Sequence, residues 1–171
     1  MRGLWKYIII GALLIIAQGA LDNYVNLSIY IDPSLFMFIL LVLPARAATV
    51  TVMLVAFATG LVVDILGNGI PGLTSAALTA AGLCRRAILS LTVPKDPSSM
   101  DGKSSIEDLG LIRFAVYAAA MSFIFLSVYI LLDTAGFRPF GQCAARLLIS
   151  LVINTALLTV IFAVTGDNRK W

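Results

Sequence analysis

The chain has 171 residues, of which 60% are hydrophobic and only 12% are charged, and its mean hydropathy is +1.00. Soluble domains contain about 45–50% apolar and about 25% charged residues, so this composition excludes an ordinary soluble fold. The net charge of +3 is spread along the chain, and no basic run is longer than Arg85-Arg86, which excludes a nucleic-acid-binding surface. The sequence therefore predicts a single integral membrane domain.

The first hydrophobic segment, residues 5–21, predicts a transmembrane helix. It follows Arg2 and Lys6 and ends in the small-residue run from Ala17 to Ala20, a pattern that secretory signals share. Because the rest of the chain is equally hydrophobic, we expect a retained signal-anchor helix, with cleavage as the alternative.

The second segment, residues 33–44, is unusually short. It is an apolar run between Pro33 and Pro44, and a helix of ten to thirteen residues is only about 15–20 Å long, against a hydrocarbon core of about 30 Å. Either residues 24–31 extend it as a broken helix, or it is tilted and shielded by its neighbours. Non-helical backbone at this depth must in either case be covered by protein.

Four further spans complete an all-α membrane protein, which we expect to be a six-helix transmembrane bundle. The fourth span is rich in small residues, which let helix backbones approach closely. The turn Gly67–Gly72 precedes it, and its Pro71 suits a helix start. The polar residues 94–110 form the predicted cytoplasmic loop. The four expected spans are 47–66, 72–93, 111–132 and 142–164.

The basic residues predict the orientation. With six spans and a cytoplasmic N-terminus, ten of the 12 lysines and arginines fall on the inner side, and only Arg138 and Arg146 fall towards the outer side. Both termini are therefore predicted to be cytoplasmic. The aspartates of the membrane segments all fall towards the outer face, namely Asp22, Asp32, Asp64 and Asp133.

Asp64, near the outer end of the third span, is the most informative charge. A carboxylate at membrane depth is costly and needs a partner. One interpretation is that it accepts hydrogen bonds from amides of the glycine-rich turn that follows. The other is that it shapes an outer groove for a partner or ligand, and the two interpretations are compatible.

The last span carries a polar stripe with a spacing of four residues: Gln142, Arg146, Ser150 and Asn154. This spacing places the four side chains along one face of the helix, which we expect to turn towards the bundle. Asp64 or Asp133 is the predicted partner of Arg146. The alternative is that Arg146 extends its guanidinium to the outer surface.

We expect no catalytic, cofactor-binding or metal site. The chain contains no histidine, and its two cysteines, Cys84 and Cys143, lie in separate hydrophobic segments without metal-ligand spacing. No nucleophile elbow, phosphate-binding loop or carboxylate pair on one helix face is present in the sequence. Enzymatic activity is therefore not expected.

Residues 33–86 resemble the rod shape-determining protein MreD family. The likeness lies in the short segment between two prolines, the block GLVVDILGNGIPGL, the small-residue helix and the arginine pair that follows. The positions that match the family block are Gly60, Asp64, Gly67, Pro71 and Gly72.

The resemblance implies a non-enzymatic bacterial inner-membrane protein of the cell-wall elongation machinery, which controls rod shape and peptidoglycan synthesis. It implies MreC as the direct partner, acting together with RodA, a transpeptidase and MreB. It also implies a fold similar to that of the substrate-binding components of energy-coupling-factor vitamin transporters. We place the MreC-binding surface at the outer ends of the third and fourth spans.

Two other functions remain open from the sequence. A substrate-binding transporter component needs an enclosed pocket with convergent polar groups, which the stripe from Gln142 to Asn154 would line. The other alternative is an unrelated small polytopic protein such as a lipid handler.

Overall fold

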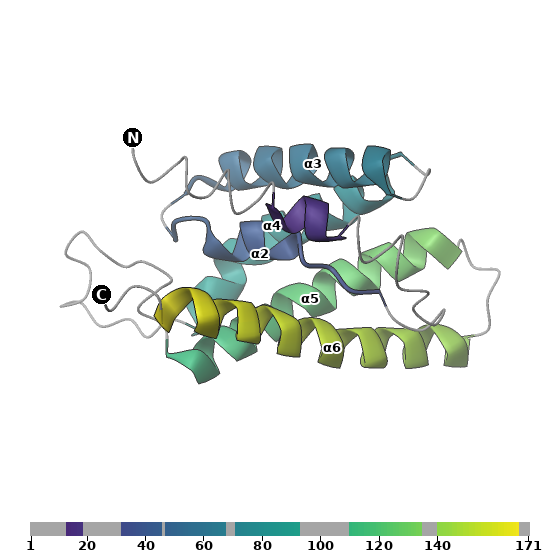
Figure 1. Ribbon diagram of the computed structural model, residues 1–171. Coiled ribbons are helices and arrows are strands. Elements are labelled where there is room, and N and C mark those ends of the chain that lie inside the picture. Colours follow the sequence, from purple (N-terminus) through teal and green to yellow (C-terminus); the bar gives the residue numbers. More distant parts are fainter. Residues whose placement is uncertain are drawn as a thin grey trace.

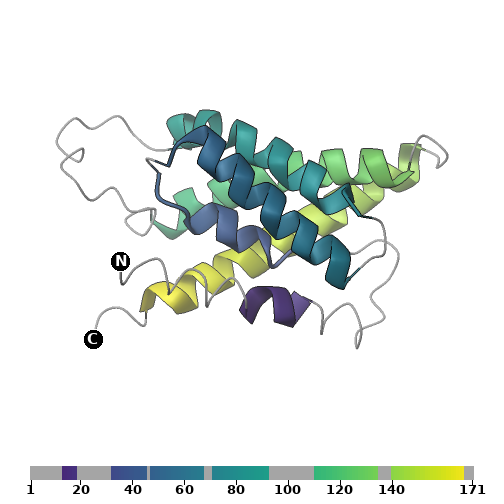
Figure 2. The same ribbon diagram turned by 90° about the horizontal axis from the view of Figure 1, so that it is seen from above.

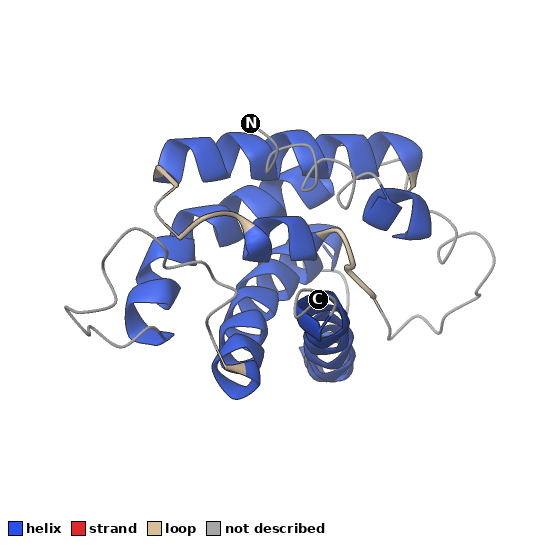
Figure 3. Ribbon diagram, turned by 60° about the vertical axis from the view of Figure 1, so that its left-hand side comes forward, coloured by secondary structure: helices blue, strands red, loops and turns tan. Residues whose placement is uncertain are grey.

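The computed structural model describes residues 13–18, 32–45, 47–67, 71–92, 110–134 and 140–167. These residues form helices joined by turns and contain no β-strand (Figure 3), which confirms the all-α class for the described part. The helices are residues 13–18, α2 (Met37–Val42), α3 (Thr49–Leu66), α4 (Leu73–Thr92), α5 (Leu111–Thr134) and α6 (Phe140–Asp167). Most of the first predicted span, residues 24–31 and the predicted loop 94–109 lie outside the described residues.

Three helices, α3, α5 and α6, are long and apolar enough to cross a membrane. This finding agrees with an integral membrane protein. The helix α4 has 20 residues, about 30 Å, but the pair Arg85-Arg86 and many small polar residues set it apart from these three. The helix α2 has six residues, about 9 Å, so it is too short to cross by itself.

The long helices pack in chain order, with α3 on α4, α4 on α5 and α5 on α6. In Figure 1, α3 and α6 lie on opposite sides of the bundle, and α2 lies between them. Seen from above, the helical residues 13–18 lie on the opposite side of α2 from α4 (Figure 2). The short helix is thus surrounded by the rest of the protein.

The helix α2 is the centre of the core. Its residues Met37, Phe38, Leu40 and Leu41 are at most 1% exposed. Three aromatic residues of α5 belong to the same apolar cluster, namely Phe114, Tyr117 and Phe125. Of the predicted span 33–44, only Met37–Val42 is α-helical. The helix stops before Pro44 because a residue that precedes proline avoids the helical conformation, and Leu43 has φ −55° and ψ 145°. The expectation that this segment is shielded by its neighbours is confirmed.

The contact between α3 and α4 depends on small residues, as expected for the fourth span. A Cβ atom added to Gly60 would lie 2.3 Å from the Cα atom of Ser75 and 2.6 Å from its amide nitrogen. Further along α4, a Cβ on Gly82 would lie 3.4 Å from the Cβ of Ala56. Because van der Waals packing drives association of helices in lipid, this close approach holds the two helices together.

Gly60→Ala is therefore expected to destabilise the protein by about 1–3 kcal/mol, because the new methyl group meets backbone atoms that cannot move alone. The measurement is the free energy of unfolding by detergent titration in mixed micelles. Gly141→Ala is the matched control, because a Cβ at Gly141 has no atom within 4 Å. Equal stability of the two variants would contradict the close packing of α3 on α4.

Candidate functional site

The residues that lead into α2 have a non-helical backbone at positions 32–34, whose polar groups are bonded by side chains of α6. The Asn154 Oδ1 atom accepts a hydrogen bond from the Ser34 amide at 2.7 Å, and its Nδ2 group donates to the Asp32 carbonyl at 2.8 Å. The Ser150 hydroxyl oxygen accepts from the Asp32 amide at 3.0 Å. Two side chains of the polar stripe thus complete three backbone hydrogen bonds.

Gln18 completes the same segment from the other side. Its Nε2 group donates to the Pro33 carbonyl at 2.7 Å, and its Oε1 atom accepts from the Leu35 amide at 3.1 Å. The carbonyls of Ser34 and Leu35 accept from amides of α2. Because an unsatisfied backbone group in lipid costs several kcal/mol, this covering is a condition for placing the segment at membrane depth. The expectation that protein covers non-helical backbone is confirmed here.

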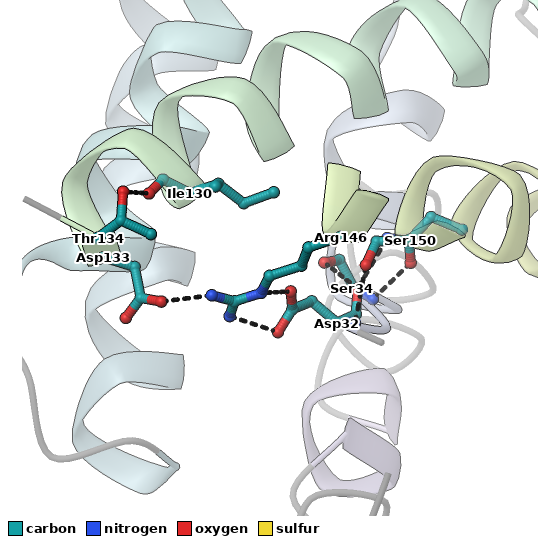
Figure 4. A network of polar contacts seen from close by, with 8 residues as sticks. Asp32, Ser34, Ile130, Asp133, Thr134, Arg146 and Ser150 are labelled. Atoms are coloured by element: carbon teal, nitrogen blue, oxygen red, sulfur yellow. Dashed lines mark hydrogen bonds and ion pairs between the residues drawn. The ribbon is translucent and has the colours of Figure 1, made fainter. Parts of the chain in front are cut away.

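Arg146 forms two ion pairs beside this segment (Figure 4). Its Nε and Nη2 atoms donate to the two carboxylate oxygens of Asp32 at 2.6 and 2.9 Å, and Nη1 donates to Asp133 Oδ2 at 2.5 Å. The guanidinium also lies 5.9 Å from the centre of the Tyr129 ring. A bidentate pair of this kind fixes geometry as well as charge, so it joins the start of the α2 segment to α5 and α6.

The partner predictions for Arg146 are confirmed in one case and wrong in two. Asp133 is a partner, whereas Asp64 is not, because its carboxylate is bonded to amides of α4. The alternative of extension to the surface is also wrong, since Arg146 is 9% exposed. Asp32 is the partner that the sequence did not reveal.

The inward orientation of the polar stripe is confirmed for Arg146, Ser150 and Asn154 and is wrong for Gln142. Ser150 and Asn154 are at most 1% exposed, whereas Gln142 is exposed. Gln142 lies one turn nearer the start of α6 than Arg146. The three later members of the stripe contact residues 32–34. The stripe therefore has three inward members.

Asp64 caps the start of α4. Its Oδ2 atom accepts hydrogen bonds from the amides of Gly72 at 2.9 Å and Ser75 at 3.2 Å, and Oδ1 accepts from the Thr74 amide at 2.9 Å. The residue is 2% exposed, and the positive end of a helix stabilises a buried carboxylate. The prediction that Asp64 binds amides of the glycine-rich turn is confirmed for Gly72, and the contact extends into the first turn of α4.

The other residues of the predicted block shape the connection from α3 to α4. Gly67 follows α3 and donates from its amide to the Val63 carbonyl at 2.9 Å. Gly72 has φ +102°, a conformation that favours glycine over residues with a Cβ. Pro71 is exposed and lies two residues before the first helical residue, slightly earlier than expected. Residues 68–70 of this turn lie outside the described residues.

Arg85 has a role that sequence reasoning missed. The sequence placed it only among the basic residues of the inner side, and the structure shows that it is 2% exposed. Its Nε atom donates to the Tyr117 hydroxyl at 2.9 Å, and its two terminal nitrogens donate to the carbonyls of Leu43 and Pro44, which follow α2. A cation suits the negative end of a helix. The signal was present as a charge inside a long apolar stretch, which normally marks an internal partner.

Comparisons with known proteins gave no match: no family model, no curated protein and no solved structure is significantly similar to this chain. Within the described residues, no group of three or more potential metal ligands occurs. The buried polar side chains of the described residues bond mainly to the backbone and to one another. The arrangement can therefore hold the short helix α2 and the α3–α4 connection in fixed positions.

Asn154→Leu is expected to destabilise the protein by about 2–5 kcal/mol, because it leaves the Ser34 amide and the Asp32 carbonyl without these partners in a buried site. Thr155→Val is the matched control, since the Thr155 hydroxyl donates only to the Leu151 carbonyl of its own helix. Unfolding by detergent titration measures both. A similar small loss in the two variants would contradict the role of Asn154.

Arg146→Met is expected to cost about 3–5 kcal/mol, because it leaves two carboxylates without their cation in a partly buried site. The triple variant Arg146→Met, Asp32→Asn, Asp133→Asn should recover much of this loss in the same titration. Exchanging the charges of Asp64 and Arg146 should give no recovery, since the two residues are not paired. Recovery in that exchange, and none in the triple variant, would overturn the assigned ion pairs.

Proposed function

We propose that this protein is a non-catalytic scaffold of the MreD type in a bacterial inner membrane, where it binds MreC and helps to control rod shape and peptidoglycan synthesis. The observation that carries the proposal is the corner between α3 and α4. In it Gly60 permits close helix packing, Asp64 caps α4, and Gly72 adopts a positive φ. Three positions of the block that resembles the MreD family thus have distinct physical roles in one local structure.

The polar side chains of the described residues support scaffolding over catalysis. Asp64, Arg85, Arg146 and Asn154 are each bonded to groups of the chain itself. Groups used in this way hold helices in position and are not free to act on a substrate. The proposed function is accordingly assembly and regulation within a complex.

The corner also suggests where MreC binds. The Asp64 carboxylate is buried, so a partner would not contact it directly; instead it fixes the backbone beside exposed side chains. Ile65 and Leu66 are 69% and 63% exposed, and Pro71, which precedes α4, is also exposed. A rigid apolar surface of this kind binds a partner with little loss of conformational entropy.

The proposed topology places this corner on the periplasmic side. It has six membrane segments, with α2 and α4 as segments held within the bundle, and cytoplasmic termini. The positive-inside rule favours the cytoplasm for the end that carries Arg85, Arg86 and Arg113, and the corner lies at the opposite end of α4. The periplasmic domain of MreC emerges on that side, and RodA, a transpeptidase and MreB complete the proposed assembly.

The transporter alternative loses its main support. Its pocket was expected to be lined by the stripe from Gln142 to Asn154, but Gln142 is exposed, and Arg146 and Asn154 bind Asp32 and the neighbouring backbone. The likeness to the fold of vitamin-transporter components is retained only as part of the MreD proposal. No observation in the described residues favours a bound solute.

The test is co-purification with MreC from solubilised membranes. The double variant Leu66→Gln, Pro71→Gln should retain at least tenfold less MreC, because central apolar contacts of an interface each contribute more than about 1 kcal/mol. In the native rod-shaped bacterium the same variant should produce rounded cells. Leu91→Gln is the matched control, since Leu91 is 87% exposed near the other end of α4.

Detergent titration of the double variant separates loss of binding from loss of folding. A double variant that is as stable as wild type and binds MreC equally well would remove the proposed surface. A protein that does not bind MreC at all, and whose depletion leaves rods unchanged, would remove the proposed function.

A further inference from the structure

The ionised side chains of the described residues are separated between the two ends of the bundle. Asp32, Asp64 and Asp133 lie at the end where α3 and α5 finish and α4 and α6 begin. Arg85, Arg86 and Arg113 lie towards the other end, where α4 finishes and α5 begins. Both ion pairs at described residues belong to Arg146, so these three arginines have no carboxylate partner within the described part of the chain.

The three arginines are close in height along the bundle. The Arg85 Nε atom donates to the Tyr117 hydroxyl at 2.9 Å, which places this part of α4 beside the second turn of α5. Arg113 lies four residues before Tyr117, about 6 Å along the helix, and Arg86 adjoins Arg85. Arg86 and Arg113 are exposed, whereas Arg85 is buried.

The surroundings of the two exposed arginines are apolar. Ile112, beside Arg113, is 80% exposed, and Leu83 and Leu91 on α4 are 55% and 87% exposed. Exposed aliphatic side chains on helices of this composition lie against lipid tails. A guanidinium among them is therefore near the boundary between acyl chains and head groups, at the level of lipid phosphates.

We propose that Arg86 and Arg113 bind the phosphate groups of anionic phospholipids at this end of the bundle. The planar guanidinium matches phosphate oxygens in a bidentate geometry. Arg85 contributes from within the bundle. Its buried charge is paired with no carboxylate of the described residues, and a charge in a low-dielectric interior acts over a longer distance than one in water. The partial negative charge at the end of α2 offsets this field only in part.

The occupant is a lipid and not a dissolved anion, because the two guanidinium groups are flanked by side chains that water would not cover favourably. Attraction to an anionic leaflet is worth about 1 kcal/mol for each basic residue near the surface, or about fivefold in affinity. If the two contributions add, loss of both arginines lowers the affinity for anionic lipid roughly 30-fold.

The experiment compares wild type with Arg86→Gln, Arg113→Gln in zwitterionic phosphatidylcholine micelles, with phosphatidylglycerol added stepwise. Binding is measured as the number of retained phosphatidylglycerol molecules in native mass spectrometry and as the rise in the thermal unfolding midpoint. Wild type should bind phosphatidylglycerol roughly 30-fold more tightly than the glutamine variant. Neither exposed side chain forms a described ion pair, so both proteins should unfold at similar temperatures in phosphatidylcholine alone.

Arg86→Lys, Arg113→Lys is the matched control, because it keeps both charges without the guanidinium plane, and it should bind more weakly than wild type but more tightly than the glutamine variant. Equal phosphatidylglycerol affinity of wild type and the glutamine variant would overturn the proposal. Stabilisation of wild type by inorganic phosphate to the same extent as by phosphatidylglycerol would show a free-anion site and also overturn it.

Discussion

Every backbone amide and carbonyl placed at membrane depth needs a hydrogen-bond partner from protein, because lipid tails offer none, and the short helix α2 makes this demand acute. A long helix satisfies its own backbone except at its ends. The helix α2 has only six residues. A large share of the backbone in residues 32–45 therefore lies at helix ends or in the non-helical part before the helix. Gln18, Ser150 and Asn154 bond the leading segment, and Arg85 bonds the carbonyls that follow the helix. Side chains from residues 13–18, α4 and α6 bond the backbone around α2. The helix α5 packs against α2 in the same apolar cluster.

The same demand explains why the buried charges lie at helix ends. Asp64 binds the amides at the start of α4, where the helix dipole is positive, and Arg85 binds the carbonyls after α2, where it is negative. Neither residue needs an opposite charge at hydrogen-bond distance. Arg146 differs, because it lies within α6 and binds two carboxylates, those of Asp32 and Asp133. In a chain with few ionisable residues, each buried one therefore has a defined structural task.

Features with local partners were predictable from the sequence, whereas those with distant partners were not. The bounds of α3 to α6 follow from apolar runs that end at proline, glycine or charged residues, and the observed ends agree within about three residues. The cap by Asp64 was predictable because the amides that donate to its carboxylate lie 8 to 11 residues away. Arg146 and Asp32 are 114 residues apart, and Asp64 and Asp133 were equally suitable in depth, so depth alone did not identify the pair. The role of Arg85 depends on the end of α2 lying beside α4 in the fold. The run from Pro33 to Pro44 does not reveal that position.

The separation of charge connects the two proposals while leaving them independently testable. An anionic leaflet attracts the end that carries Arg86 and Arg113, and the same attraction during insertion favours the cytoplasmic side for that end. In the proposed topology the corner with Asp64 faces the periplasm, and its carboxylate adds no exposed charge there because three amides surround it. A partner approaching there meets apolar side chains on a fixed backbone. Loss of lipid binding would remove neither Leu66 nor Pro71 from that surface, and loss of MreC binding would leave both arginines in place. The two proposals therefore rest on the chemistry of opposite ends of the bundle.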